Sequence, residues 1–232
     1  MADFLTPGFW AAVGQIVMID ILLGGDNAVI IALACRSLPD RQRTLGILWG
    51  TAGAIGLRVV LIFFALALLA IPYLKIAGGV LLLWIGIKLL VQDNDDHSKI
   101  EASDKLWDAV KTVIMADFVM SVDNVIAIAG AAENASSEHP MPLVVFGLVV
   151  SIPIIVAGSQ LVLKLMDRFP VIVTLGGMML GWIAGGMILS DPALDERMPQ
   201  TKGIEYAFSI VGALLVFASG RWLLTARKNR LR

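Results

Sequence analysis

Two copies of one polar pattern lie inside apolar segments of this chain, 97 residues apart. The pattern is a methionine, an aspartate two residues later, and an Asp-Asn pair six residues after that. Its members are Met18, Asp20, Asp26 and Asn27 in the first copy and Met115, Asp117, Asp123 and Asn124 in the second. An ionised carboxylate in hydrocarbon costs roughly 2.5 kcal/mol or more, so four of them at matched positions need a compensating partner. We expect that partner to be a cation bound between two related halves of the chain.

The donor atoms of the pattern indicate which cation it would hold. Carboxylate and amide oxygens are hard ligands that suit Mg²⁺, Ca²⁺ and Mn²⁺, and Ser121 adds a hydroxyl beside the second copy. Met18 and Met115 are either gap-fillers in the core or accessory thioether ligands, which would favour Mn²⁺ over the other two ions. The histidines, His97 and His139, fall in predicted loops, which argues against an imidazole site for Zn²⁺ or Cu²⁺.

The spacing of the first copy fixes which side chains share a helix face. Asp20 and Asn27 are seven residues apart, close to two helical turns, whereas Asp26 lies about 100° away around the axis. The pair Gly24-Gly25 precedes Asp26, and paired glycines can kink or break a helix and so free carbonyl oxygens as ligands. Ser121-Val122 takes that place in the second copy, where a break is less expected.

Arg58 is the one cationic residue in the middle of a predicted apolar span. It either makes a structural ion pair with one of the aspartates or serves as a counter-charge that occupies the site once the metal has left. Four aspartates and Arg58 sum to −3, and a divalent ion would bring the total to −1. Because a low dielectric does not tolerate four ionised carboxylates, some would carry protons in the empty site. The alternative is that the aspartates pair only with helix ends and polar neighbours.

The elements that carry these residues are predicted to be membrane spans. The 232-residue chain is 58% hydrophobic and only 16% charged, and a spanning helix needs about 20 largely apolar residues. We therefore predict an all-α polytopic membrane protein with seven transmembrane helices. They are placed at 9–35, 44–70, 72–91, 109–132, 142–164, 171–189 and 203–225.

The duplication extends beyond the polar pattern. Gly50 matches Gly147 at the offset of 97, and at 98 Pro72, Gly78, Gly79 and Trp84 match Pro170, Gly176, Gly177 and Trp182. Within a single transmembrane domain, 1–232, we expect repeat 1 at 9–91, a cytoplasmic linker at 92–108, repeat 2 at 109–189 and an unpaired helix at 203–225. Three helices per repeat invert the second copy in the membrane, so this 3+3 inverted repeat predicts a substrate site near the midplane.

The positive charges indicate the orientation. Thirteen of the eighteen Lys and Arg residues fall in the loops after the first, third and fifth predicted helices and in the C-terminal tail, against three on the other side. The positive-inside rule then puts the N-terminus outside and the C-terminus in the cytoplasm, in the cytoplasmic (inner) membrane. Besides the bilayer and a divalent ion, we expect no nucleic-acid partner, because no basic stripe is present; a homo-oligomer is left open.

The linker, the cysteine and the glycine pairs are expected to have structural roles. The linker 92–108 is interpreted as solvated, with a regulatory metal sensor built on Asp93, Asp95, Asp96 and His97 as the alternative. The single cysteine, Cys35, excludes an internal disulfide and is expected to be inert. The glycine pairs are expected to be close-packing contacts between helices; they are Gly78-Gly79, Gly176-Gly177 and Gly185-Gly186.

The strings LLGGDNAVIIALA and ADFVMSVDNVIAIAGAA resemble the two hallmark segments of the TerC (tellurium-resistance C) family of integral membrane proteins, within the lysine-exporter-like superfamily. The chain is most similar to the short branch associated with manganese-responsive riboswitches. This resemblance implies Mn²⁺ efflux from the cytoplasm, with Mn²⁺ as the transported substrate and no permanently bound cofactor. The ligands it implies are Asp20, Asp26, Asn27, Asp117, Asp123 and Asn124.

Two other functions remain open from the sequence. A transporter of the same class could carry Ca²⁺, Mg²⁺ or a basic amino acid, whose carboxylate would need a partner such as Arg58. An intramembrane aspartyl protease would also use paired aspartates, but Leu23 and Val122 stand where its motif needs glycine. We therefore expect a transporter rather than an enzyme, working by alternating access and coupled to protons.

Overall fold

The computed structural model describes residues 7–69, 71–91, 102–134, 140–195 and 198–230, and this part of the chain is helical without any strand. Its helices are α1 (Pro7–Cys35), α2 (Asp40–Leu69), α3 (Leu74–Val91), α4 (Ala102–Asn134), α5 (Pro140–Arg168), α6 (Val171–Leu189), α7 (Pro192–Asp195) and α8 (Lys202–Arg230). Every predicted span coincides with one long helix, and α7 is a single turn in the loop between α6 and α8.

Five of these helices have the length and composition of a membrane span: α2, α3, α5, α6 and α8. In α1 the apolar stretch among the described residues is shorter, Gly25–Cys35. The helix α4 carries Asp117 and Asp123 along its length, together with charged residues in its first turns. The chain is therefore an all-helical, polytopic membrane protein, as composition predicts.

The start of α4 and the continuity of α1 differ from expectation. Helix α4 begins at Ala102, so the last seven residues of the predicted linker are helical; the remainder, with the alternative metal-sensor residues Asp93, Asp95, Asp96 and His97, lies outside the described residues. Helix α1 continues through Gly24-Gly25 without interruption. The hypothesis of a helix break at that glycine pair is therefore wrong, and no carbonyl oxygens are freed there.

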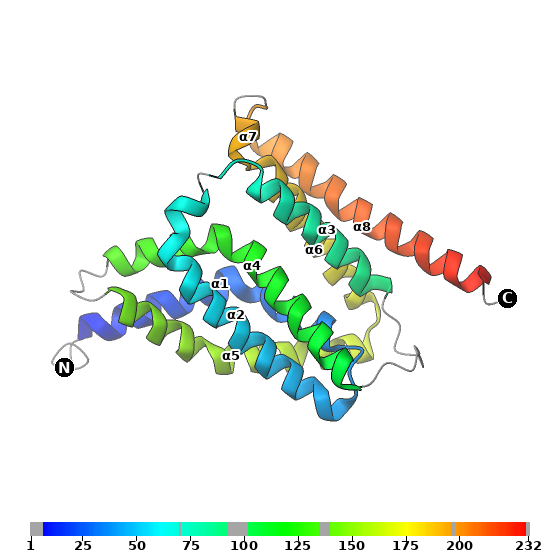
Figure 1. The fold of residues 1–232 in the computed structure, drawn as a ribbon, viewed down its shortest axis with the longest axis horizontal. Coiled ribbons are helices and arrows are strands. Elements are labelled where there is room, and N and C mark those ends of the chain that lie inside the picture. The colour runs from blue at the N-terminus through cyan, green and yellow to red at the C-terminus, as the bar shows by residue number, and fades with distance from the viewer. Residues whose placement is uncertain (1–6, 70, 92–101, 135–139, 196–197, 231–232) are drawn as a thin grey trace.

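The long helices form two bundles (Figure 1). In the first, α1 packs mainly against α5 and α2 mainly against α4; we call α1, α2, α4 and α5 the four-helix bundle. In the second, α6 packs against both α3 and α8, and these three form the three-helix bundle. The predicted repeats are thus not separate bodies, because each contributes two helices to the first bundle and one to the second.

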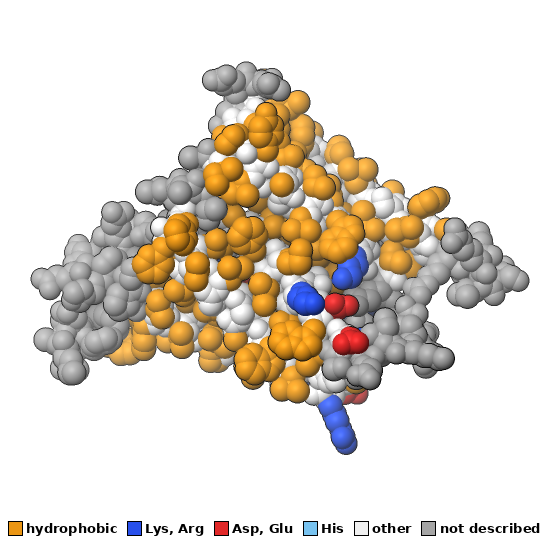
Figure 2. Space-filling model, viewed as in Figure 1, with side chains coloured by type: hydrophobic (Ala, Val, Ile, Leu, Met, Phe, Trp, Pro, Cys, Tyr) orange, Lys and Arg blue, Asp and Glu red, His pale blue; other side chains and the backbone are white. Residues whose placement is uncertain are grey.

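Apolar side chains both fill and cover the molecule. Ile30, Leu33, Leu82, Ile85 and Leu180 are buried in one continuous core. Outside, apolar side chains cover most of the face in Figure 2, and the visible charges gather near the C-terminal end of α3 and the N-terminal ends of α2 and α4. Such an exterior is unfavourable in water and is expected of helices that face lipid tails.

The glycine pairs lie where helices approach most closely, as predicted. A Cβ at Gly185 would lie 2.1 Å from the carbonyl oxygen of Phe208 in α8, and one at Gly79 would lie 2.9 Å from that of Ala184 in α6. At Gly78, Gly176 and Gly177 a Cβ would lie 2.8, 2.9 and 2.5 Å from side-chain atoms of a neighbouring helix. The absence of a side chain therefore lets α6 touch α8 and α3 backbone to backbone.

Candidate cation site

The equivalent aspartates of the two motif copies meet at one guanidinium. Arg58 in α2 donates from Nη1 to Oδ1 of Asp20 in α1, and from Nη2 to Oδ1 of Asp117 in α4 at 2.5 Å. All three side chains are buried, with exposed fractions of 2%, 0% and 6% in that order. Arg58 therefore forms an ion pair, as one of its two expected roles requires, and it pairs with two aspartates instead of one.

Two serines complete this network. Ser121 accepts a hydrogen bond from Arg58 Nε at 3.1 Å and donates to Oδ2 of Asp117 at 2.9 Å. The hydroxyl of Ser151, in α5, donates to Oδ2 of Asp20. All four helices of the four-helix bundle therefore contribute, and each oxygen of the two carboxylates has a partner. Such satisfaction is required because an unpaired buried charge costs several kcal/mol.

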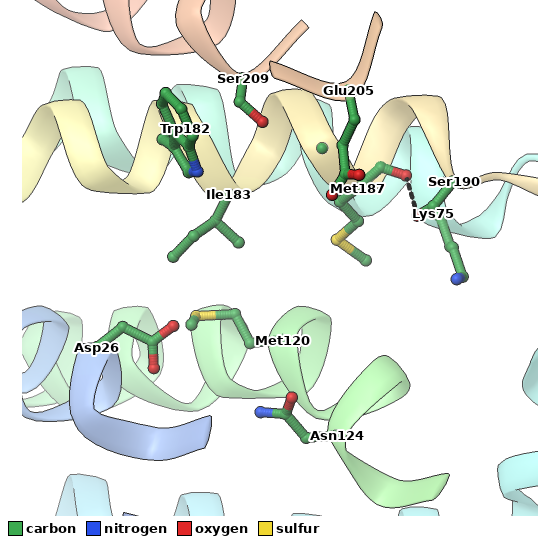
Figure 3. Close-up of a pocket in the computed structure, with 11 residues that line it drawn as sticks. Asp26, Lys75, Met120, Asn124, Trp182, Ile183, Met187, Ser190, Glu205 and Ser209 are labelled. Atoms are coloured by element: carbon green, nitrogen blue, oxygen red, sulfur yellow. Dashed lines mark hydrogen bonds between the residues drawn. The ribbon is translucent and has the colours of Figure 1, made fainter. Parts of the chain in front are cut away.

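The next motif residues face a cavity instead. Asp26 and Asn124 line a cavity of about 430 Å³ between the two bundles, within the size range of ligand sites. Figure 3 shows Asp26, Met120 and Asn124 on one wall, with Met187 directed toward them from α6 on the other. The remaining lining residues are Lys75, Trp182, Ile183, Gly186, Ser190, Glu205 and Ser209. Oδ1 of Asp26 accepts a hydrogen bond from the backbone N–H of Asn27 at 2.9 Å, and Asp26 lines the cavity.

Asn27 faces the interior of the four-helix bundle, beside Asp117 of the Arg58 network. Its Oδ1 is buried with no hydrogen-bond partner in the described part of the chain. With Asp117 it lines a cavity of about 10 Å³, closed by Ile30, Ile31, Ala54 and Val113. That volume is close to the minimum for a single water molecule. The space therefore holds at most one water molecule or one ion without its hydration shell.

The predicted ligand set is therefore divided rather than clustered. Within the described residues, no group of three or more His, Cys, Asp or Glu side chains is close enough to hold a metal. Asp20 and Asp117 pair with Arg58, Asp26 and Asn124 share the large cavity, and the side chain of Asp123 lies outside the described part.

The prediction for Met18 and Met115 is wrong in both of its forms. These side chains are 62% and 42% exposed on the outer surface, so they neither fill the core nor approach the cavity. Each lies two residues before its aspartate, which is about 200° around a helix, so the methionine and that aspartate point to nearly opposite sides.

Sequence reasoning missed three residues of the site: Ser151, Met120 and Met187. Ser151 was one of several polar residues in the spans, with no feature that distinguished it. Met120 precedes Asn124 by four residues and so shares its face, a signal that was available. Met187 comes from another bundle, and no sequence spacing connects it to the motif.

Comparisons with known proteins agree on one family. Residues 5–229 match the profile described as "Integral membrane protein TerC family". The chain is 42% identical over 205 residues to the membrane protein YjbE of Bacillus subtilis, covering 88% of this chain and 91% of that protein. It is 26% identical to YceF of the same organism, covering 84% and 76% of the two chains, and 24% identical to the inner membrane protein YoaE of Escherichia coli, covering 75% and 36%. No solved structure matches the chain.

Proposed function

The chain belongs to the TerC family of integral membrane proteins, and from that premise we propose that it exports divalent cations from the cytoplasm, with Mn²⁺ as the main substrate. The observation that carries the proposal is the convergence of both acidic motifs in one bundle, beside a polar cavity between the bundles. Carboxylate and amide oxygens there are ligands that Mn²⁺ accepts.

The large cavity has room for a hydrated ion. Six waters at roughly 30 Å³ each occupy roughly 180 Å³, well below the volume of about 430 Å³. Asp26 and Asn124 come from opposite motif copies and offer hard oxygens to such an ion. The separate cavity beside Asn27 and Asp117 holds only about 10 Å³, so an ion would reach these side chains only after it has lost its waters and the helices have moved.

Arg58 supports an exchange mechanism. Its guanidinium pairs with Oδ1 of Asp20 and Oδ1 of Asp117, where a metal cation would otherwise bind. A divalent ion that enters between these carboxylates replaces one positive charge with two. We propose that Arg58 is the counter-charge of the metal-free state and that ion and guanidinium alternate at these two carboxylates.

The helix pairing supports the inverted repeat and indicates what moves. In the sequence repeat, α1 corresponds to α4 and α2 corresponds to α5. The pairing of α1 with α5 therefore corresponds to the pairing of α4 with α2, and the structure contains both. Because this interlocks the repeats, they cannot rock against each other as rigid bodies. We propose instead that the three-helix bundle moves against the four-helix bundle around the cavity.

Export also needs a driving force. Moving a dication out of a negative interior is uphill by about 4.6 kcal/mol per 100 mV, which is about three decades of concentration. Inward proton movement supplies this energy, and the buried aspartates are the groups able to carry protons. The large cavity reaches Lys75 and Glu205, near the starts of α3 and α8. The orientation expected from the Lys and Arg counts puts these helix ends on the outer side of the membrane.

A transport assay tests the proposal. Inside-out vesicles that contain the purified protein and have an acidic interior should accumulate Mn²⁺, and Asp26→Asn or Asp123→Asn should lower the rate at least about tenfold, as loss of a metal-site group does. Asp104→Asn is the matched control, because Asp104 is exposed in the first turn of α4, away from the cavity. Equal rates in Asp26→Asn and the unmodified protein would contradict the site, and no transport of any cation would contradict the function.

The geometry gives less support to a transporter of basic amino acids and to an intramembrane protease. A basic amino acid needs a cationic group for its carboxylate. The guanidinium of Arg58 is already engaged by two aspartates, which leaves Lys75 on the wall of the large cavity as the candidate. A protease needs a water between its two aspartates, whereas Arg58 stands between Asp20 and Asp117. Ca²⁺ and Mg²⁺ share the oxygen chemistry of Mn²⁺, so the assay must include them as competitors.

A further inference from the structure

We infer that Met120 and Met187 are the specificity-determining residues of the large cavity, and that their thioethers select a transition-metal ion over Mg²⁺ and Ca²⁺. This inference rests on the proposed function, since it concerns selectivity among the cations that the protein would transport. It assigns a chemical role to two side chains that are not among the defining residues of either acidic motif.

The position of Met120 supports the first half of the inference. Met120 lies one helical turn before Asn124 on α4 and lines the cavity with it. Figure 3 shows its thioether end directed toward the carboxylate of Asp26. Met120 is only 5% exposed, so its side chain is held in place beside the two oxygen donors rather than spread over the surface.

Met187 supplies the second thioether from the opposite side. It belongs to α6 in the three-helix bundle, is 6% exposed, and points across the gap toward Met120 and Asn124 (Figure 3). Its carbonyl oxygen accepts a hydrogen bond from Ser190 Oγ at 3.1 Å. An ion held by both methionines would therefore connect the two bundles that the proposed transport cycle moves.

The chemistry of the lining explains why two thioethers matter here. Hard groups alone do not separate Mn²⁺ from Mg²⁺ or Ca²⁺, because all three bind carboxylate and amide oxygens. A thioether is a soft donor, which contributes to a transition-metal site and little to either alkaline-earth ion. The formal charges on the cavity are Asp26, Glu205 and Lys75, with a sum of −1, so the lining attracts cations in general and the sulfurs supply the discrimination.

Replacement of sulfur at constant size tests the inference. Met120→Leu and Met187→Leu conserve volume and apolarity, so the fold should tolerate them. Mn²⁺ uptake into vesicles would be measured against Mg²⁺ and Ca²⁺, with Cd²⁺ as a soft competitor. We expect the double variant to lose Mn²⁺ preference over Mg²⁺ by at least about tenfold, the scale on which metal sites respond to lost partners, and to lose sensitivity to Cd²⁺.

Met166→Leu is the matched control, because Met166 is equally buried in the core but away from the cavity; it should leave both quantities unchanged. Met120→Cys keeps a sulfur at the site and should retain Cd²⁺ inhibition. Unchanged selectivity and unchanged Cd²⁺ inhibition in the double leucine variant would overturn the inference while transport itself persists. Failure of the unmodified protein to transport any divalent ion would instead overturn the proposed function.

Discussion

At the scale of single residues, the main finding is that one guanidinium neutralises the equivalent aspartates of two motif copies. Arg58 has no counterpart in the second half, where Ile155 stands at the offset of 97. A duplicated acidic pair is thus served by a single, unduplicated cation. A buried ion pair contributes little net stability compared with apolar residues of the same size, so a role in exchange is a better reason for its presence than stability.

Removal of Arg58 should both destabilise the protein and make it respond to metal. Arg58→Met leaves Asp20 and Asp117 buried without a counter-charge, which should cost about 3–5 kcal/mol. If the guanidinium takes the place of a cation, Mn²⁺ should raise the thermal midpoint of Arg58→Met by more than it raises that of the unmodified protein. Thermal unfolding in detergent, with and without Mn²⁺, measures both effects.

The control for this experiment is Arg41→Met, on the same helix but exposed, which should change stability by no more than about 0.5 kcal/mol. A destabilised Arg58→Met variant with no additional response to Mn²⁺ would leave the ion pair as a purely structural feature.

At the scale of elements, a buried aspartate between α6 and α7 fixes the start of α3. Asp191 is fully buried and accepts hydrogen bonds from the backbone N–H groups of Tyr73 at 2.9 Å, Ile76 at 3.1 Å and Ala193 at 2.8 Å. Tyr73 has a φ of 68°, a left-handed conformation that non-glycine residues adopt only where the surroundings enforce it. The carboxylate thus caps α3 and holds the strained residue before it.

The pKa of Asp191 makes this cap sensitive to acid. Burial acts to raise the pKa, but the backbone N–H groups outweigh it and lower the pKa below the ordinary value of 3.8. The stabilisation is therefore complete above pH 3.8 and is lost as the pH falls through the lower pKa of the folded state. Asp191→Ala should cost about 1–3 kcal/mol at neutral pH, because buried donors lose their acceptor.

Thermal unfolding over a pH series measures this effect. The gap in stability between the unmodified protein and Asp191→Ala should be constant near neutral pH and should narrow below pH 3.8. Asp104→Ala, at an exposed site, should show no such gap. A difference that stays constant down to the lowest pH would mean that the carboxylate charge does not contribute.

At the scale of the whole molecule, the two bundles touch at few places and enclose the cavity between them. One contact is Gly78 of α3 against Val119 of α4, where a Cβ on the glycine would lie 2.8 Å from a valine methyl. A second contact is Gly176 of α6 against Val29 of α1, where a Cβ on the glycine would lie 2.9 Å from a valine methyl. Gly78 and Gly176 are equivalent positions in the sequence repeat, so related glycines make both contacts.

A disulfide across one of these contacts should stop transport. In a Cys35→Ala background, Gly78→Cys with Val119→Cys places two Cβ atoms within bonding range and joins the bundles. Mn²⁺ uptake should fall to background after oxidation and recover after reduction. The matched control is Ala28→Cys with Gly158→Cys, whose Cβ atoms would lie 3.7 Å apart and which joins α1 to α5 within one bundle; it should leave uptake intact. Full transport by the oxidised Gly78–Val119 pair would show that the bundles do not move apart there.

Local properties of the chain determined the class of protein and the residues of interest. Composition and the length of apolar runs predict all seven long helices, because a membrane span must satisfy its own backbone hydrogen bonds within one segment. The offset of 97 identifies the two acidic motifs, and helix periodicity separates Asp26 from the face shared by Asp20 and Asn27. These features depend only on neighbours in the sequence.

Only the tertiary structure decided which side chains meet. The bonds of Arg58 to Asp20 and Asp117 join residues 38 and 59 positions apart, and the bond of Ser151 to Asp20 spans 131. No periodicity relates residues on different helices, because contact depends on how each helix is rotated about its axis and which helix packs beside it. The sequence therefore predicted one cluster of four aspartates. In the structure, Asp20 and Asp117 pair with Arg58, whereas Asp26 lines a cavity. The opposite wall of that cavity, with Met187, belongs to the other bundle.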